Sequence, residues 1–211
     1  LPEINRNNIK NNKIISCPGC YPTSILLPLI PLLKNKLISN NNIIIDSKSG
    51  YSGAGRGVHK KYIKKNLYES LSAYGITTHR HNSEIQQELD LCTGEKNNFQ
   101  FTPHLTPMFR GILSTIYVDL RRGVTKNKVN LVLNNYFKKE IFVNIAKPNT
   151  LLSTNDVINT NKCIISVCKS KHKKKLIILS VIDNLIKGGS GQAVQNMNIL
   201  YNLNENEGLN A

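Results

Sequence analysis

The chain has 211 residues, 40% of them hydrophobic, so it is long enough to bury one main core. Its net charge of +15 comes from lysines spread along the whole chain beside many asparagines, as an A/T-rich genome imposes on surface positions, and we expect no nucleic-acid partner. Pro28 and Pro31 interrupt the longest apolar run, so no segment is expected to span a membrane.

The cysteines and the densest basic run lead to two further expectations. Five cysteines, an odd number without the spacing of a disulfide framework, predict a reducing compartment. The cytoplasm is the expected location, and a plastid is the alternative. Residues 171–175 are almost entirely basic, but they lie between two predicted strands, which indicates a hairpin tip in solvent.

The first predicted elements place a cysteine where a helix begins. A strand over 13–16 and a Pro-Gly turn precede an apolar helix over 22–38, and Pro22 suits its first turn. Cys20 would then face free backbone N–H groups, which favour the thiolate that attacks carbonyl carbon. The alternative is that Cys20 is a small buried apolar residue.

A glycine-rich loop follows the next predicted strand, over 43–47. Residues 50–57 contain four glycines, which let backbone N–H groups approach a ligand, while Lys48 and Arg56 add positive charge. This composition favours a phosphate or carboxylate, although many such turns bind nothing. The spacing matches neither a P-loop nor the dinucleotide fingerprint. A helix over 57–71 is expected next.

Two histidines and an arginine precede the next predicted helix, over 83–93. Ser83 and Gln86 have the spacing of a capping box that would open this helix. A histidine is the usual partner of a catalytic thiol, which makes His79 and His81 candidates. The alternative is a turn that faces solvent.

The rest of the pattern predicts an α+β fold. Early strands alternate with helices, and later strands pair more often with one another, which indicates a mixed, largely antiparallel sheet covered by helices on one face. The further expected elements are strands over 98–105, 112–120, 141–145, 162–168 and 175–182, and helices over 125–138 and 190–202.

Five segments, in order along the chain, closely resemble the N-acetyl-gamma-glutamyl-phosphate reductases of arginine biosynthesis. They are P-G-C-Y-P-T at 18–23, D-S-K-S-G-x-S-G-A-G-R at 46–56, H-R-H at 79–81, F-T-P-H-L-x-P-M-x-R-G-I at 101–112, and D-N-L-x-K-G with G-Q-A-V-Q-N-M-N at 183–198. Five ordered segments are far more specific than any one of them. The family is related to aspartate-semialdehyde and glyceraldehyde-phosphate dehydrogenases, which implies a catalytic domain like theirs.

The resemblance implies NADPH-dependent reduction of N-acetyl-glutamyl 5-phosphate, an acyl phosphate, to N-acetyl-glutamate 5-semialdehyde and phosphate. NADP(H) is the implied cofactor, and Cys20 corresponds to the nucleophile that forms a thioester. The acid/base histidine of the family lies in the H-R-H segment. We assign this role to His79, with His81 as the alternative, since either ring of the segment can face the thiol.

The resemblance also implies the other contacts of the site. Substrate contacts are assigned to Ser49, Arg80, His104 and Arg110. The two arginines are candidates to hold the carboxylate or phosphate, because a guanidinium group binds either through two parallel hydrogen bonds. Cofactor contacts are assigned to Gly50, Ser52, Gly53 and Asn196. No metal is expected. The family uses the uncovered face of its sheet for association, so a homo-oligomer, a dimer or a tetramer, is expected.

One departure from the family concerns the residue at position 17. The reductases usually have asparagine where this chain has Cys17, and that residue helps to shape the active site, so the change puts the substrate pocket in doubt. Cys17 also creates a C-x-x-C with Cys20, which predicts a disulfide that would block the nucleophile under oxidation. The Cys17→Asn variant should then lose any peroxide sensitivity.

A second departure is that nothing before residue 13 resembles the glycine-rich turn of a dinucleotide-binding (Rossmann) domain. We therefore expect residues 1–16 to be the tail of such a domain, 17–186 the catalytic and oligomerisation domain, and 187–211 a helix that returns to the cofactor domain. The chain alone should then bind NADPH weakly and be inactive. The alternatives are a truncated or decayed non-catalytic homologue and a C-x-x-C redox module.

Overall fold

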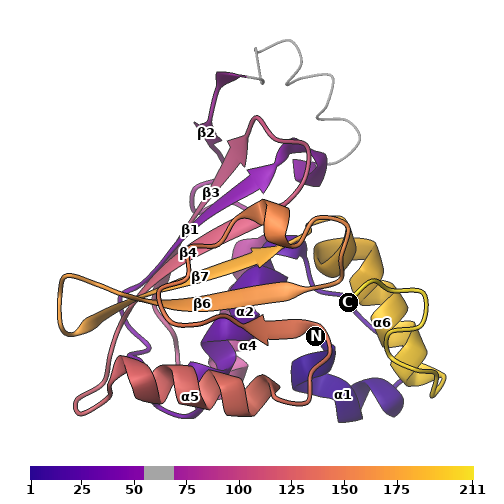
Figure 1. The fold of residues 1–211 in the computed structure, drawn as a ribbon, viewed down its shortest axis with the longest axis horizontal. Coiled ribbons are helices and arrows are strands. Elements are labelled where there is room, and N and C mark those ends of the chain that lie inside the picture. Colours follow the sequence, from indigo (N-terminus) through magenta and orange to yellow (C-terminus); the bar gives the residue numbers. More distant parts are fainter. Residues whose placement is uncertain (55–68) are drawn as a thin grey trace.

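A mixed sheet forms the centre of the computed structural model, which describes residues 1–54 and 69–211. In these residues the sheet has seven strands in the order β2-β3-β1-β4-β7-β6-β5 (Figure 1). Neighbours β1 and β3, and β5 and β6, are parallel, while the other four pairs are antiparallel. The strands are β1 (Ile43–Gly50), β2 (Ser72–Ala73), β3 (Phe99–Thr106), β4 (Ile112–Asp119), β5 (Val143–Ile145), β6 (Cys163–Lys169) and β7 (Lys175–Ile182).

Helices cover one face of this sheet, and the predicted α+β fold is confirmed. Helix α2 is buried from Tyr21 to Leu33 and packs against α4, α5 and β4. Helices α1 and α6 pack against each other beside the sheet, near both ends of the chain (Figure 1). The helices are α1 (Pro2–Lys10), α2 (Cys20–Lys34), α4 (His81–Thr93), α5 (Lys126–Phe137) and α6 (Gly191–Leu200), with short helices η1 (Tyr51–Ala54), η3 (Thr154–Asp156) and the π-helix η4 (Ile186–Ser190).

A chain of buried hydroxyl groups shows which face of the sheet α2 covers. The Ser114 hydroxyl lies 2.8 Å from that of Ser24 on α2 and 2.7 Å from that of Ser47 on β1. Side chains alternate between the two faces of a strand, so Ser49 faces α2 as well, whereas Asp46 and Lys48 face the uncovered side.

Two predicted elements differ from the structure or lie outside it, and one helix was missed. Residues 13–19 form neither a strand nor a turn, and Ile14 is 89% exposed, because no neighbouring strand pairs with this segment. The helix predicted over 57–71 lies mostly outside the described residues. Helix α1 was not predicted, since its few apolar residues gave little periodic signal.

The predicted capping box is also wrong. Helix α4 begins at His81, and its N-cap residue Arg80 makes no side-chain cap. Ser83 therefore lies inside the first turn, where its hydroxyl donates to the Arg80 carbonyl. In the part of the chain that the structure describes, no helix is long and apolar enough to cross a bilayer.

Candidate active site

The loops of the candidate site gather at one edge of the sheet. Because β1 and β3 run parallel, and β4 runs antiparallel to both β1 and β7, the carboxyl ends of β1, β3 and β7 meet there. Asn184, just after β7, joins two other loops: its Oδ1 accepts from the Gly111 N–H at 2.6 Å, and its Nδ2 donates to the Ser52 hydroxyl at 3.0 Å. Asn184 is thus a connecting residue that the sequence analysis did not single out.

Cys20 lies at the first residue of α2, as the sequence predicts, but its thiol is not activated there. Burial raises the pKa of the half-buried Cys20 thiol to about 11, although the N–H groups of Tyr21 and of Cys20 itself and the charge of Arg80 act in the opposite direction. The expectation that the helix start by itself favours the thiolate is therefore wrong, because desolvation is the larger effect. At neutral pH the thiol keeps its proton and needs a base.

His81 packs directly on the residue before Cys20. A Cβ at Gly19 would lie 2.3 Å from His81 Nε2, so only glycine fits under this ring. His79 lies behind it: the two rings are 4.7 Å apart, and His79 Nδ1 accepts from the His81 N–H at 3.1 Å. The structure therefore brings His81, rather than His79, next to the peptide that carries the nucleophile.

His81 is expected to stay neutral far into the acid range. Burial, His79 and Arg80 lower its pKa to about 4. In the unfolded chain the ordinary pKa is about 6.5, so the unfolded state takes up the proton first, and this group removes stability as pH falls from about 6.5 to about 4. Proton NMR of the imidazole C–H resonances, assigned with His81→Gln, should show that titration near pH 4. A midpoint near the ordinary value would contradict this burial.

Glu84 is a further site residue that the sequence analysis missed. Its Oε1 accepts from the Gly19 N–H at 2.9 Å. His81 and Glu84 are three residues apart on α4, so both side chains lie on one face of the helix and hold Gly19 between them. The spacing H-x-x-E was visible in the sequence, but it pointed to Gly19 only once α4 was known to begin at His81.

The four predicted substrate-binding residues differ in what they contact. Arg80 is exposed, and its charge acts on Cys20, so it is available to an anion near the thiol. Arg110 Nε lies 3.2 Å from the carboxylate of buried Asp183. Ser49 is 2% exposed and donates to the Gly50 carbonyl. His104 lies on the uncovered face, where its Nδ1 is 3.0 Å from Asp46 Oδ1, so its side chain points away from α2.

Three of the predicted cofactor contacts are held by neighbouring loops. A Cβ at Gly50 would lie 2.6 Å from the backbone of Phe109 and Arg110, so close packing by itself accounts for glycine there. At Gly53 a Cβ would approach the Ser49 hydroxyl to 3.1 Å. Ser52 accepts from Asn184. Arg56, which the sequence assigned to the same loop, lies outside the described residues.

Asn196, the fourth predicted cofactor contact, has a free acceptor. Its Nδ2 donates to Cys17 Sγ at 3.4 Å, whereas its Oδ1 is buried without a hydrogen-bond partner. Gln192, one turn earlier on α6, is fully buried and leaves both amide atoms without a partner. Buried polar atoms without partners are rare in native structures, so this face of α6 fits a polar ligand group.

Cys17 and Cys20 are both free thiols in this structure, and Gly19 between them is extended at φ −67° and ψ 162°. The disulfide that the C-x-x-C spacing predicts under oxidation stays a prediction. In the described ranges, no cluster of three or more His, Cys, Asp or Glu side chains could hold a metal ion.

Comparison with known families assigns the class of the protein. The model of the semialdehyde dehydrogenase dimerisation domain matches residues 20–184, which span the sheet, α2 and the H-R-H segment. The chain therefore belongs to the semialdehyde dehydrogenase family. Within it, the N-acetyl-gamma-glutamyl-phosphate reductases of Thermoanaerobacter pseudethanolicus and Caldicellulosiruptor bescii are 47% and 50% identical to the chain over 209 residues, 99% of its length. The resemblance seen in the sequence is confirmed.

The same comparisons define how much of the relatives the chain represents. It spans about 60% of the length of these reductases. Among solved structures, aspartate semialdehyde dehydrogenase II from Vibrio cholerae superposes with a TM-score of 0.74 at 17% identity, over 95% of this chain and 67% of that one. A probable aspartate-semialdehyde dehydrogenase from Pseudomonas aeruginosa superposes with a TM-score of 0.75 at 15% identity. At these identities the similarity establishes the fold.

Proposed function

We propose that the chain carries the thioester-forming part of an N-acetyl-gamma-glutamyl-phosphate reductase, which converts N-acetyl-glutamyl 5-phosphate into N-acetyl-glutamate 5-semialdehyde and phosphate. The observation that supports this most directly is the imidazole of His81 packed on Gly19, beside the cysteine that begins α2. In this arrangement Cys20 supplies the nucleophile and the neutral imidazole of His81 supplies the base.

The residues of the chain divide the chemistry between them. The Cys20 sulfur attacks the acyl carbon as its proton passes to His81, and phosphate leaves with the electrons of the broken C–O bond, which produces a thioester. Arg80, exposed beside the thiol, binds the anionic substrate. His79 keeps the backbone of His81 in place through the hydrogen bond at 3.1 Å, and Glu84 does the same for Gly19 at 2.9 Å.

NADPH, when bound, supplies the hydride that reduces the thioester to the aldehyde. The buried Asn196 Oδ1, which lacks a partner beside Cys17, fits the donor of a carboxamide. Ser52 and Gly53 would line the same site from the loop after β1. We further propose that residues 1–16 and 187–211 connect this domain to the cofactor domain, since α1 and α6 pack against each other beside the sheet.

The decisive test joins the chain to the cofactor domain of a relative. The N-terminal domain of the Thermoanaerobacter reductase, fused before Leu1, should restore phosphate-dependent reduction of NADP by N-acetyl-glutamate 5-semialdehyde. Cys20→Ser should abolish the signal, because the hydroxyl is a far weaker nucleophile. The matched control is Cys92→Ser, which changes another half-buried cysteine and should stay active.

Two results would support the alternatives instead. A folded fusion without activity would indicate a decayed homologue, whereas zinc bound in stoichiometric amount would indicate a metal module. NADPH titrated into the chain alone should show no micromolar binding, because the site would lack the cofactor domain.

We also propose that the uncovered face of the sheet forms a homodimer interface, in agreement with the description of the matched domain. Ile44, Tyr117 and Ile177 pair in register across β1, β4 and β7 and form an apolar row on that face. Ile44 is 47% and Tyr117 is 38% exposed. Self-association would remove this row from water.

A charge on that row is expected to separate the dimer. Tyr117→Glu should shift the protein from dimer to monomer in light scattering after gel filtration, because an unpaired carboxylate would be buried at the interface. Leu131→Glu is the matched control, since Leu131 is 59% exposed on α5, away from this face. A monomeric starting protein, or an equal shift in the control, would count against the proposed interface.

A further inference from the structure

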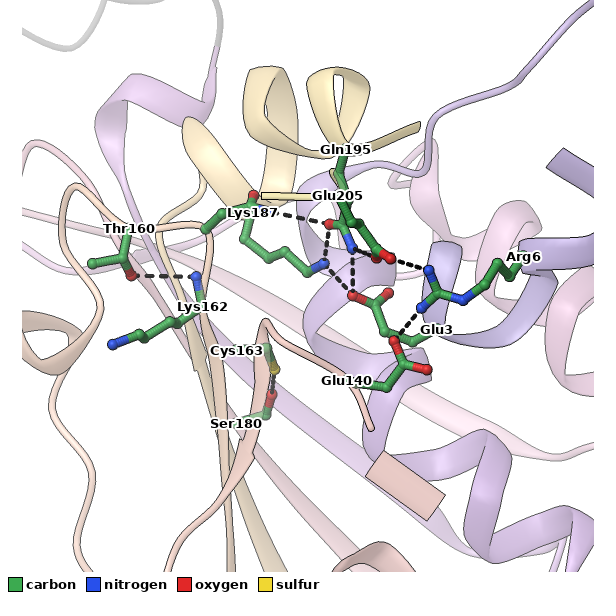
Figure 2. Close-up of polar contacts among 11 residues, drawn as sticks. Glu3, Arg6, Glu140, Thr160, Lys162, Cys163, Ser180, Lys187, Gln195 and Glu205 are labelled. Atoms are coloured by element: carbon green, nitrogen blue, oxygen red, sulfur yellow. Dashed lines mark hydrogen bonds and ion pairs between the residues drawn. The ribbon is translucent and has the colours of Figure 1, made fainter. Parts of the chain in front are cut away.

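A buried cluster of charged and amide groups lies between α1, η4 and α6 (Figure 2). Lys187 is fully buried, and its ammonium donates to Glu3 Oε1 at 2.5 Å and to Gln195 Oε1 at 2.7 Å. Gln195 Nε2 donates to the same Glu3 oxygen at 3.1 Å, and the Phe142 ring lies 5.6 Å from the ammonium. We call Glu3, Lys187 and Gln195 the inner cluster.

A second set of charges continues this cluster towards the surface. Gln195 Nε2 also donates to Glu205 Oε1 at 2.7 Å. The Arg6 guanidinium pairs with both Glu140 and Glu205, as Figure 2 shows. We call Arg6, Glu140 and Glu205 the outer cluster. Its side chains are partly exposed.

The inner cluster is one residue away from the Cys20 side chain. Gly188 follows Lys187, and a Cβ at Gly188 would lie 2.7 Å from the Cys20 Cβ and 3.0 Å from its Cα. The Gly188 N–H donates to the Asp183 carbonyl at 3.0 Å, which fixes the other side of this peptide. The backbone of η4 is therefore held between β7 and the inner cluster, directly against the first residue of α2.

We propose that Lys187 is a positioning residue for the nucleophile: its bonds to Glu3 and Gln195 keep Gly188 against Cys20 and fix the direction of the thiol. A buried ammonium held by two acceptors restrains its own backbone, and that backbone restricts the rotamers of the side chain packed on it. The inference rests on the proposed function, since the direction of the thiol matters for turnover only if Cys20 attacks the substrate.

The test measures the accessibility of Cys20 in the 211-residue chain itself. Glu3→Gln/Lys187→Met keeps the volume of both side chains and removes both buried charges together with the hydrogen bonds of the ammonium. The chain is treated with iodoacetamide, and the alkylation of each cysteine is followed by peptide mass mapping. Cys163 is fully buried in β6, so it reacts only when the whole domain unfolds and serves as an internal reference. The measured quantity is the ratio of the Cys20 rate to the Cys163 rate.

In Glu3→Gln/Lys187→Met this ratio is expected to rise roughly tenfold, because Gly188 no longer confines the thiol. The double variant is used because Lys187→Met alone destabilises the domain, which raises the Cys163 rate and by itself lowers the ratio. Arg6→Met is the matched control: it breaks two ion pairs of the outer cluster and should leave the ratio unchanged. An unchanged ratio in the double variant, or an equal rise in Arg6→Met, would overturn the proposal.

A second readout separates this inference from the proposed function. In the fusion with the cofactor domain, Lys187→Met should lower kcat roughly tenfold and leave KM nearly unchanged, because the thiol is misdirected while substrate contacts remain. A wild-type fusion without activity would overturn the proposed function but leave the alkylation result intact. Normal kcat in the variant, in an active fusion, would overturn the positioning role.

Discussion

Gly19→Ala is expected to lower kcat roughly 100- to 10,000-fold in the fused enzyme, the range that a general base contributes. The new Cβ would lie 2.3 Å from His81 Nε2 and 2.7 Å from Cε1, so the ring must leave its position on the peptide before Cys20. Glu84 accepts from the Gly19 N–H, which prevents the peptide from moving instead. The effect should appear in kcat, since Arg80, the proposed substrate contact, is not altered.

A double-mutant cycle identifies the cause of this loss. If the clash with the imidazole is responsible, Gly19→Ala should destabilise the chain in urea unfolding, whereas Gly19→Ala in a His81→Ala background should have little effect on stability. An equal loss of stability in both backgrounds would mean that the alanine strains the start of α2 and not the contact with His81.

Lys187→Met is expected to have the largest effect on stability, about 3–5 kcal/mol, since removal of one partner leaves a buried charge uncompensated. Burial alone would raise the pKa of Glu3, but Lys187 and the hydrogen bonds around the carboxylate outweigh it and hold the pKa below its ordinary value. Glu3 is thus ionised in the native state and would lose its counter-charge. Urea unfolding at neutral pH measures the difference.

The control for this prediction removes both charges. Glu3→Gln/Lys187→Met should recover most of the lost stability, because a neutral, well-packed pair replaces a charge pair that was costly to bury. If the double variant is as unstable as Lys187→Met, the hydrogen bonds of Gln195 to the charged groups, and not the unpaired charge, would account for the loss.

Much of the fold followed from local patterns. The strands β1, β4, β6 and β7 are rich in Ile, Leu and Val, and their ends agree with the predicted ranges within three residues. Helix α2 was visible because a continuous apolar run followed Pro22. Residues 13–16 share this composition but find no strand to pair with, so composition alone misassigned them.

The candidate site was predicted in its components more than in its arrangement. Cys20 at the start of α2 and the H-R-H segment followed from residue types and order. His104 was assigned to the substrate on the same grounds, yet the pleat of β3 turns its side chain to the uncovered face. Glu84 and Lys187 were not singled out, because their partners Gly19 and Glu3 are 65 and 184 residues away along the chain.

The sequence by itself determined the α+β architecture, the cysteine at a helix start and the resemblance to the reductases, because each depends on residues that are neighbours along the chain. Only the tertiary structure decided that His81 is the ring on Gly19, that burial raises the pKa of Cys20, and that a lysine cluster lies behind it. Desolvation and contact depend on which segments pack together, and local sequence does not contain that information.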